Sequence, residues 1–201
     1  MEVLMTNETM SVTRVGALSR PWGSRALIAA MMMVLAAGLA VAQPQPSVTD
    51  AGDGWSRAEL GGGFVFEWTV DGDEIEGKIS APTTGWVAIG FNPTNRMQGA
   101  TYVIGYVQNN TVNMRHDWGH TPTGHQAVTA AGGTSRLTAI GGSERNGRTE
   151  LHFRLPMNPG DRFFSPIKAG ERNTVIWAFG PNGSNNYTAY HAQRGAVTIA
   201  F

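Results

Sequence analysis

Apolar and more polar residues alternate with a period of two along much of this chain, and this pattern restricts the fold more than any other feature. In one segment, Phe64, Phe66, Trp68 and Val70 share one face of an extended chain, and the residues between them share the other. Such alternation is typical of a β-strand that buries one face. After position 42, no window of about eleven residues shows the period that an amphipathic helix requires. We therefore predict an all-β protein.

Further strand candidates recur at short, regular intervals. Two nearly continuous apolar runs, over 85–91 and 100–107, are suited to central strands that are buried on both faces. The other candidates are 74–80, 111–118, 135–141, 148–155, 174–179 and 196–201. Clusters of Gly, Asn and Pro separate them, as tight turns require. About eight to ten strands without helical crossovers predict an antiparallel β-sandwich or barrel.

The N-terminal segment has the features of a signal peptide. Three arginines precede an uncharged apolar run over 26–42, which ends in Ala-Val-Ala. We predict a cleaved signal peptide over 1–42, a polar lead-in over 43–57 and one β-domain over 58–201, in a periplasmic or secreted protein. An uncleaved membrane anchor is the alternative, although the run is shorter than the roughly 20 residues that span a bilayer.

Composition excludes several classes of function. The chain has no cysteine, which rules out disulfides, thiolate catalysis, iron–sulfur clusters and covalently attached haem. Its formal net charge is zero and it has no charge run, so nucleic acid and anionic lipid are not expected partners. It carries no P-loop, nucleophile elbow or dinucleotide fingerprint. We therefore expect no catalytic residues, and no membrane span in the mature chain.

Three histidines lie close together in the segment HDWGHTPTGH, at His116, His120 and His125. Their spacing aligns them neither on a helix nor on one face of a strand. We interpret them as solvated loop residues. The alternative is a metal site built by the loop, which would make the protein a metal-dependent enzyme. A fourth histidine, His152, is expected on the outward face of a strand.

Two further residues stand in loops where no apolar pattern accounts for them. Met97 lies in the polar loop between the two most apolar strands, and His191 lies just before the last strand. A thioether and an imidazole are the axial pair that holds haem in some six-coordinate cytochromes. Each residue taken alone also fits an ordinary loop position, and spacing alone does not pair them.

The pairing comes from a resemblance. The segment 85–107 (GWVAIGFNPTNRMQGATYVIGYV) resembles the core of the DOMON superfamily, where a Gly-Trp strand leads to an Asn-Pro turn, a Met and a second apolar strand. The segment 190–195 (YHAQRG) resembles the C-terminal end of its haem-binding members, which include the cytochrome domain of cellobiose dehydrogenase and plant secreted DOMON proteins. The resemblance covers about 58–201. It implies a β-sandwich of immunoglobulin-like topology that holds one non-covalent haem b.

The resemblance also implies roles for individual residues. Met97 and His191 fall on the two axial ligands of the haem iron. Arg96 or Arg194 would pair with a haem propionate, and solvation of each arginine is the alternative. The expected pocket wall consists of Trp86, Phe91, Tyr102 and Tyr190, with ordinary core packing as the alternative for each. Such a protein carries single electrons to or from a redox partner protein that the sequence does not identify.

A secreted carbohydrate-binding β-sandwich without haem is the competing interpretation. Its binding platform would be exposed aromatic residues, for which Trp55, Trp118 and Trp177 are the candidates. In that case Met97 and His191 would be incidental.

Overall fold

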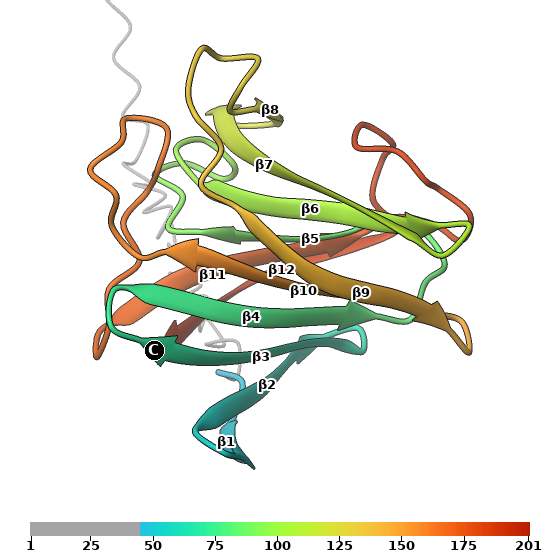
Figure 1. Cartoon of the computed structure of the whole chain (residues 1–201), viewed down its shortest axis with the longest axis horizontal. Coiled ribbons are helices and arrows are strands. Elements are labelled where there is room, and N and C mark those ends of the chain that lie inside the picture. The colour runs from blue at the N-terminus through green and yellow to red at the C-terminus, as the bar shows by residue number, and fades with distance from the viewer. Residues whose placement is uncertain (1–44) are drawn as a thin grey trace, which may run out of the picture. The chain divides into compact units, whose positions relative to one another are not determined.

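The computed structural model describes residues 45–201; the predicted signal peptide and its cleavage site lie outside the described residues. The described chain is all-β, with twelve strands and no helix (Figure 1). The strands are β1 (Val48–Gly52), β2 (Trp55–Gly61), β3 (Phe64–Asp71), β4 (Glu74–Ala81), β5 (Val87–Phe91), β6 (Thr101–Gln108), β7 (Thr111–Thr121), β8 (Gly124–Ala127), β9 (Thr138–Arg145), β10 (Arg148–Pro156), β11 (Arg172–Phe179) and β12 (Gln193–Ala200).

The strands form two six-stranded sheets that pack face to face. The first sheet has the order β1-β2-β3-β4-β10-β9, and the second has the order β12-β11-β5-β6-β7-β8. Every neighbouring pair is antiparallel. The predicted antiparallel β-sandwich is therefore confirmed.

The period-two pattern separates core from surface as predicted. On β3, the side chains of Phe64, Phe66 and Trp68 point between the sheets and are buried. On β10, apolar residues alternate in the same way, so that half-buried His152 faces outward and contacts Glu76. Removing such apolar faces from water is the main source of stability for a domain without disulfides.

The second sheet is buried on both faces along its central strands. All five residues of β5 are buried, as the continuous apolar run predicted. One face of this strand joins the core between the sheets. The other face joins a small second apolar cluster, formed by Trp86, Ala88 and Ile104, on the outer face of the second sheet. Loops must cover this outer face, because strand residues facing solvent would otherwise be exposed.

Three strands, β1, β2 and β8, were not predicted from the sequence, and two of them, β1 and β8, lie at sheet edges. The segment 43–57, expected to be a polar lead-in, contains β1 and the start of β2, and β8 lies in the region expected to be a loop. Every residue of β1 is exposed, and β8 has only half-buried residues. β1 and β8 are edge strands that pair through backbone hydrogen bonds without an apolar face, so their sequences carry no alternation.

Candidate functional site

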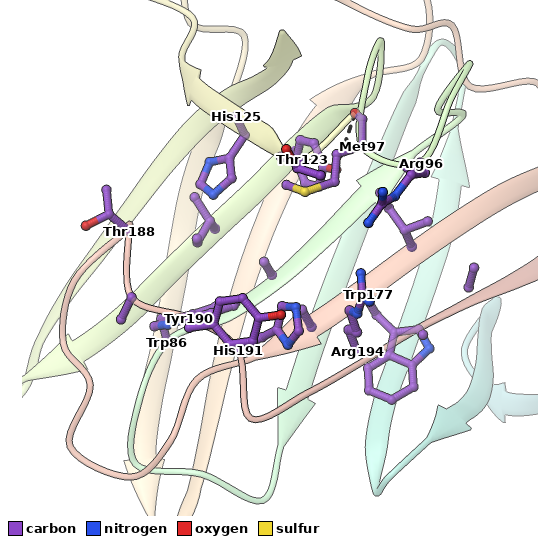
Figure 2. Close-up of a pocket in the computed structure, with 18 of the residues that line it drawn as sticks. Trp86, Arg96, Met97, Thr123, His125, Trp177, Thr188, Tyr190, His191 and Arg194 are labelled. Carbon is purple, nitrogen blue, oxygen red and sulfur yellow. Dashed lines mark hydrogen bonds between the residues drawn. The ribbon is translucent and has the colours of Figure 1, made fainter. Parts of the chain in front are cut away.

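A cavity of about 520 Å³ lies on the outer face of the second sheet (Figure 2). Its floor consists of small or aliphatic side chains from the sheet, namely Ala88, Ile104, Ile176, Ala178 and Ala196. The residues that alternate with them along β11, such as Val175 and Phe179, point into the core instead. The floor is therefore flat and apolar, which suits a planar apolar ligand.

Two loops from opposite ends of the second sheet cover this floor. The Met97 loop (92–100) follows Phe91 at the end of β5, and the His191 loop (180–192) follows Phe179 at the end of β11. Because Phe91 pairs with Val175, and Phe179 with Val87, these loops start at opposite ends of the antiparallel pair (Figure 1). Both loops contribute side chains to the cavity.

The Met97 loop is fixed mainly by backbone hydrogen bonds. The Met97 N–H donates to the carbonyl of Pro122 (3.3 Å), and its carbonyl accepts from the hydroxyl of Tyr102 (3.4 Å). Arg96 adopts a left-handed conformation (φ 56°), which is uncommon for a residue with a side chain. The loop lies directly on Gly119 of β7, where an added Cβ would stand 1.8 Å from the Met97 carbonyl oxygen. This position therefore requires glycine.

The His191 loop is held to the sheet at several points. Ser184 accepts a backbone hydrogen bond from Trp86 (3.0 Å), and Ala192 donates one to Phe179 (2.8 Å). Between these points, the ring of Tyr187 covers the guanidinium of Arg115, whose central carbon lies 4.2 Å from the ring centre. Such cation–π contacts contribute about 0.5–2 kcal/mol.

His191 itself is half-buried at the cavity wall. Burial lowers the pKa of its imidazole, and the nearby positive charge of Arg194 lowers that pKa further. The ring is therefore neutral at neutral pH, the form that binds a metal. The adjacent Tyr190 packs against it with 4.2 Å between ring centres and is 80% exposed, so its ring forms part of the cavity rim.

The structure brings seven of the eight predicted cofactor-binding residues to this one cavity: Trp86, Arg96, Met97, Tyr102, Tyr190, His191 and Arg194. Figure 2 shows Met97 on one side of the cavity and His191 on the opposite side. Arg96 and Arg194, both exposed, lie together at one flank of the cavity.

Phe91 is the exception and does not line the cavity. It is fully buried between the sheets, with its ring centre 6.1 Å from that of Phe66 and 6.0 Å from that of Phe201. The reason is strand geometry, because Phe91 shares a face of β5 with Val87 and Ile89. Its neighbour Gly90 occupies the cavity-side face, and an added Cβ there would stand 2.5 Å from the ring of Tyr102.

The interpretation of the histidine cluster as solvated loop residues is wrong, because all three lie on strands and two of them are buried or half-buried. His116 lies on β7, is 3% exposed, and accepts a hydrogen bond at Nδ1 from the backbone N–H of Arg136 (3.0 Å). Burial lowers the pKa of His116 to about 4. His125 lies half-buried on β8 and lines the cavity. Only His120 is exposed.

The histidines do not converge on a metal. His116 and Asp117 are neighbours on β7 and point to opposite faces of the sheet, and His125 bonds to Asp117. Within residues 45–201, no three His, Asp or Glu side chains are grouped so that they could hold a metal ion. The loop-built metal site thus finds no support in the geometry.

Asp117 is a site residue that the sequence reasoning missed. Its side chain has no exposed area, and its carboxylate accepts hydrogen bonds from Arg115 Nε (2.5 Å) and Nη2 (2.6 Å) and from His125 Nδ1 (2.6 Å). Burial raises the pKa of Asp117, but the hydrogen bonds from His125 and Arg115 outweigh it and the net pKa is lowered. The sequence feature that could have identified it is the spacing of Arg115 and Asp117, which places both side chains on one face of the predicted strand 111–118.

The three tryptophans of the carbohydrate alternative do not form one platform. Trp55 lies on β2 beside Lys78 of the first sheet, and Trp118 lies on β7 against Phe163. Trp177 is buried on β11. A sugar ring could not stack on more than one of them.

No helix in residues 45–201 has the length and apolar character needed to cross a membrane. One comparison with known proteins identifies a family. A family model described as "DOMON domain" matches residues 60–180. The sequence has no match among curated proteins.

Two solved structures are similar to the chain. The cytochrome domain of Myriococcum thermophilum cellobiose dehydrogenase matches with 15% identity and a TM-score of 0.54, over 78% of this chain and 88% of that chain. The cytochrome b domain of pyranose dehydrogenase from Coprinopsis cinerea matches with 17% identity and a TM-score of 0.49, over 77% and 80%. At 15% identity, the similarity to the Myriococcum thermophilum domain shows a shared fold and nothing more.

Proposed function

The chain belongs to the DOMON family, and from this membership we propose that it is an exported cytochrome domain that carries single electrons on one non-covalent haem b. The observation that carries the proposal is the placement of Met97 and His191. They come from loops at opposite ends of the second sheet, and they line opposite sides of one apolar cavity.

The residues of the cavity fit a haem. The cavity volume lies within the range of about 300–1,000 Å³ that is usual for cofactor pockets. The floor is apolar, as a porphyrin ring requires, and the buried indole N–H of Trp86 on the wall has no hydrogen-bond partner in the described chain. The exposed guanidinium groups of Arg96 and Arg194 lie at one flank, where they would pair with the two propionates.

His191 and Met97 would have different roles in binding the haem iron. When bound, haem supplies an iron that alternates between ferric and ferrous states. His191 would provide the stronger axial ligand, an imidazole that is neutral at neutral pH. Met97 would provide a thioether, which favours the ferrous state. If both side chains bind the iron, no iron position would be left for dioxygen or substrate, so we propose electron transfer without catalysis.

Substitution of the two ligands tests the proposal. We expect the wild-type protein to bind haem and to show sharp α and β bands when reduced. His191→Ala should lose most of the haem, because nothing covalent retains it. Met97→Ala should keep haem, shift its iron toward high spin and bind added carbon monoxide. Met97→His should stay six-coordinate and have a lower potential.

Matched controls separate ligation from packing. Met157 is buried in the core, and Met157→Leu should leave the spectrum unchanged because volume-conserving swaps cost less than about 1.5 kcal/mol. His120→Ala should also have no effect, since His120 is exposed. A Met97→Ala protein with the wild-type spectrum would show that another residue is the ligand. A wild-type protein that binds no haem would refute the function itself.

A further inference from the structure

His125 lines the cavity but has no part in the proposed ligand pair. Figure 2 places it on the wall at the flank away from Arg96 and Arg194. Its Nδ1 lies 2.6 Å from a carboxylate oxygen of Asp117, which fixes the ring. Its Nε2 makes no hydrogen bond to any residue of the described chain. Because an ionised carboxylate can only accept a hydrogen bond, Nδ1 carries a proton and Nε2 is the nitrogen free to gain or lose one.

The carboxylate beside His125 is built to stay negative. Asp117 is completely buried. Its Oδ1 accepts a hydrogen bond from Arg115 Nε, and its Oδ2 accepts one from Arg115 Nη2. The ring of Tyr187 in turn covers the guanidinium of Arg115. The side chain of His125 is 21% exposed, so the pair is screened less than a surface pair would be. The carboxylate of Asp117 therefore fixes both the orientation of the His125 ring and the nitrogen that carries its proton.

Other charged and titratable groups face His125 from several elements. They are Asp117 and Arg115 of β7, Tyr102 of β6, Tyr187, Tyr190, His191 and Arg194 around the His191 loop, and Arg96 of the Met97 loop. Burial raises the pKa of Tyr102, whose ring centre lies 5.7 Å from that of His125. Arginines stay charged, and His191 is engaged as the proposed iron ligand.

We propose that His125 is a redox-linked proton acceptor of the cavity: its Nε2 takes a proton from hydronium in solvent, leaving water, when the cofactor accepts one electron from a one-electron donor. It returns that proton to water when the electron leaves. The inference rests on the proposed function. An imidazolium is repelled more strongly by a ferric centre than by a ferrous one, and the low dielectric of the cavity strengthens this difference. The proton therefore compensates the charge of the electron.

The test is the midpoint potential of the haem-loaded protein between about pH 5 and pH 9. For the wild type, we expect the potential to fall as pH rises, because proton uptake by His125 assists reduction. At its steepest, each pH unit should change the ratio of reduced to oxidised protein tenfold. His125→Gln keeps an amide donor for Asp117 but cannot take a proton, so its potential should not vary with pH. His120→Gln, in the same hairpin, should behave as the wild type.

A measurement without mutation gives a second test. The imidazole resonances of His125 in the wild-type protein should titrate at a higher pH in the reduced than in the oxidised state. Equal titration in both states, or a pH-dependent potential retained in His125→Gln, would overturn the inference. A haem-loaded wild type with a pH-independent potential would overturn it too and leave the proposed function intact. A protein that binds no haem would refute both the inference about His125 and the proposed function.

Discussion

The buried histidine of β7 predicts how the protein responds to acid. His116 is 3% exposed, and its Nε2 has no hydrogen-bond partner in the described chain. Its Nδ1 accepts from the backbone of Arg136, so the proton of the neutral ring resides on Nε2. Burial opposes the charged form, and the neighbouring carboxylates of Asp117 and Asp161 compensate only in part. The folded protein therefore holds His116 neutral well below the pH at which an unfolded chain would protonate it.

The size of the effect follows from the two pKa values. The pKa is about 4 in the folded protein and 6.5 in the unfolded chain. Between these values the unfolded state binds more protons, so the free energy of unfolding falls as pH falls. The full difference corresponds to about 3 kcal/mol, fully present above pH 6.5 and lost by about pH 4. This loss is a large part of the 5–15 kcal/mol typical of a domain.

Urea denaturation at several pH values measures this dependence. His116→Asn keeps an acceptor near the N–H of Arg136 and cannot be protonated. It should be less stable than the wild type at pH 7, but the difference should shrink steadily toward pH 4. Asp117 and Glu76 have lowered pKa values, so their protonation reduces stability only below about pH 4.5. It does so in both proteins, so it does not contribute to the difference between them. Parallel pH profiles for the two proteins would refute the reasoning.

Two further predictions concern the Met97 loop and export. Gly119→Ala should lower the free energy of unfolding by about 1–3 kcal/mol and weaken haem retention, because the added Cβ would clash with the Met97 carbonyl. Gly141→Ala, where an added Cβ contacts nothing, is the control. Equal urea midpoints for the two variants would contradict the prediction. Intact-mass analysis of protein from its native compartment should show a chain that begins at Gln43, and retention of residues 1–42 in a membrane fraction would favour the anchor.

The sandwich was predictable because its central strands carry their own signal. The alternation on β3 and the continuous apolar run of β5 result directly from burial on one face and on two faces. The edge strands β1 and β8 bury little, so nothing in their side chains distinguishes them from loops. The prediction for His116 failed because its burial depends on Phe164 and on the backbone of Arg136, which are distant in the sequence.

The cavity required the topology as well as the sequence. Local patterns placed Met97 and His191 in loops, but only the pairing of β11 with β5 brings those loops to opposite ends of the same surface. Phe91 was misplaced because its face of β5 cannot be known until the two faces of a fully apolar strand are assigned to core and cavity. Asp117 was missed because a buried carboxylate becomes visible only with its partners Arg115 and His125.

The length of β5 then sets the distance across which the two loops must reach. Five residues at about 3.4 Å each span roughly 17 Å along the strand. Met97 and His191 line the cavity from these two ends, and the small side chains of the floor between them leave room for a flat ring. A shorter strand would bring the loops into contact, and a longer one would separate the two side chains. The continuous apolar run that first identified a central strand is therefore also what spaces the candidate ligands.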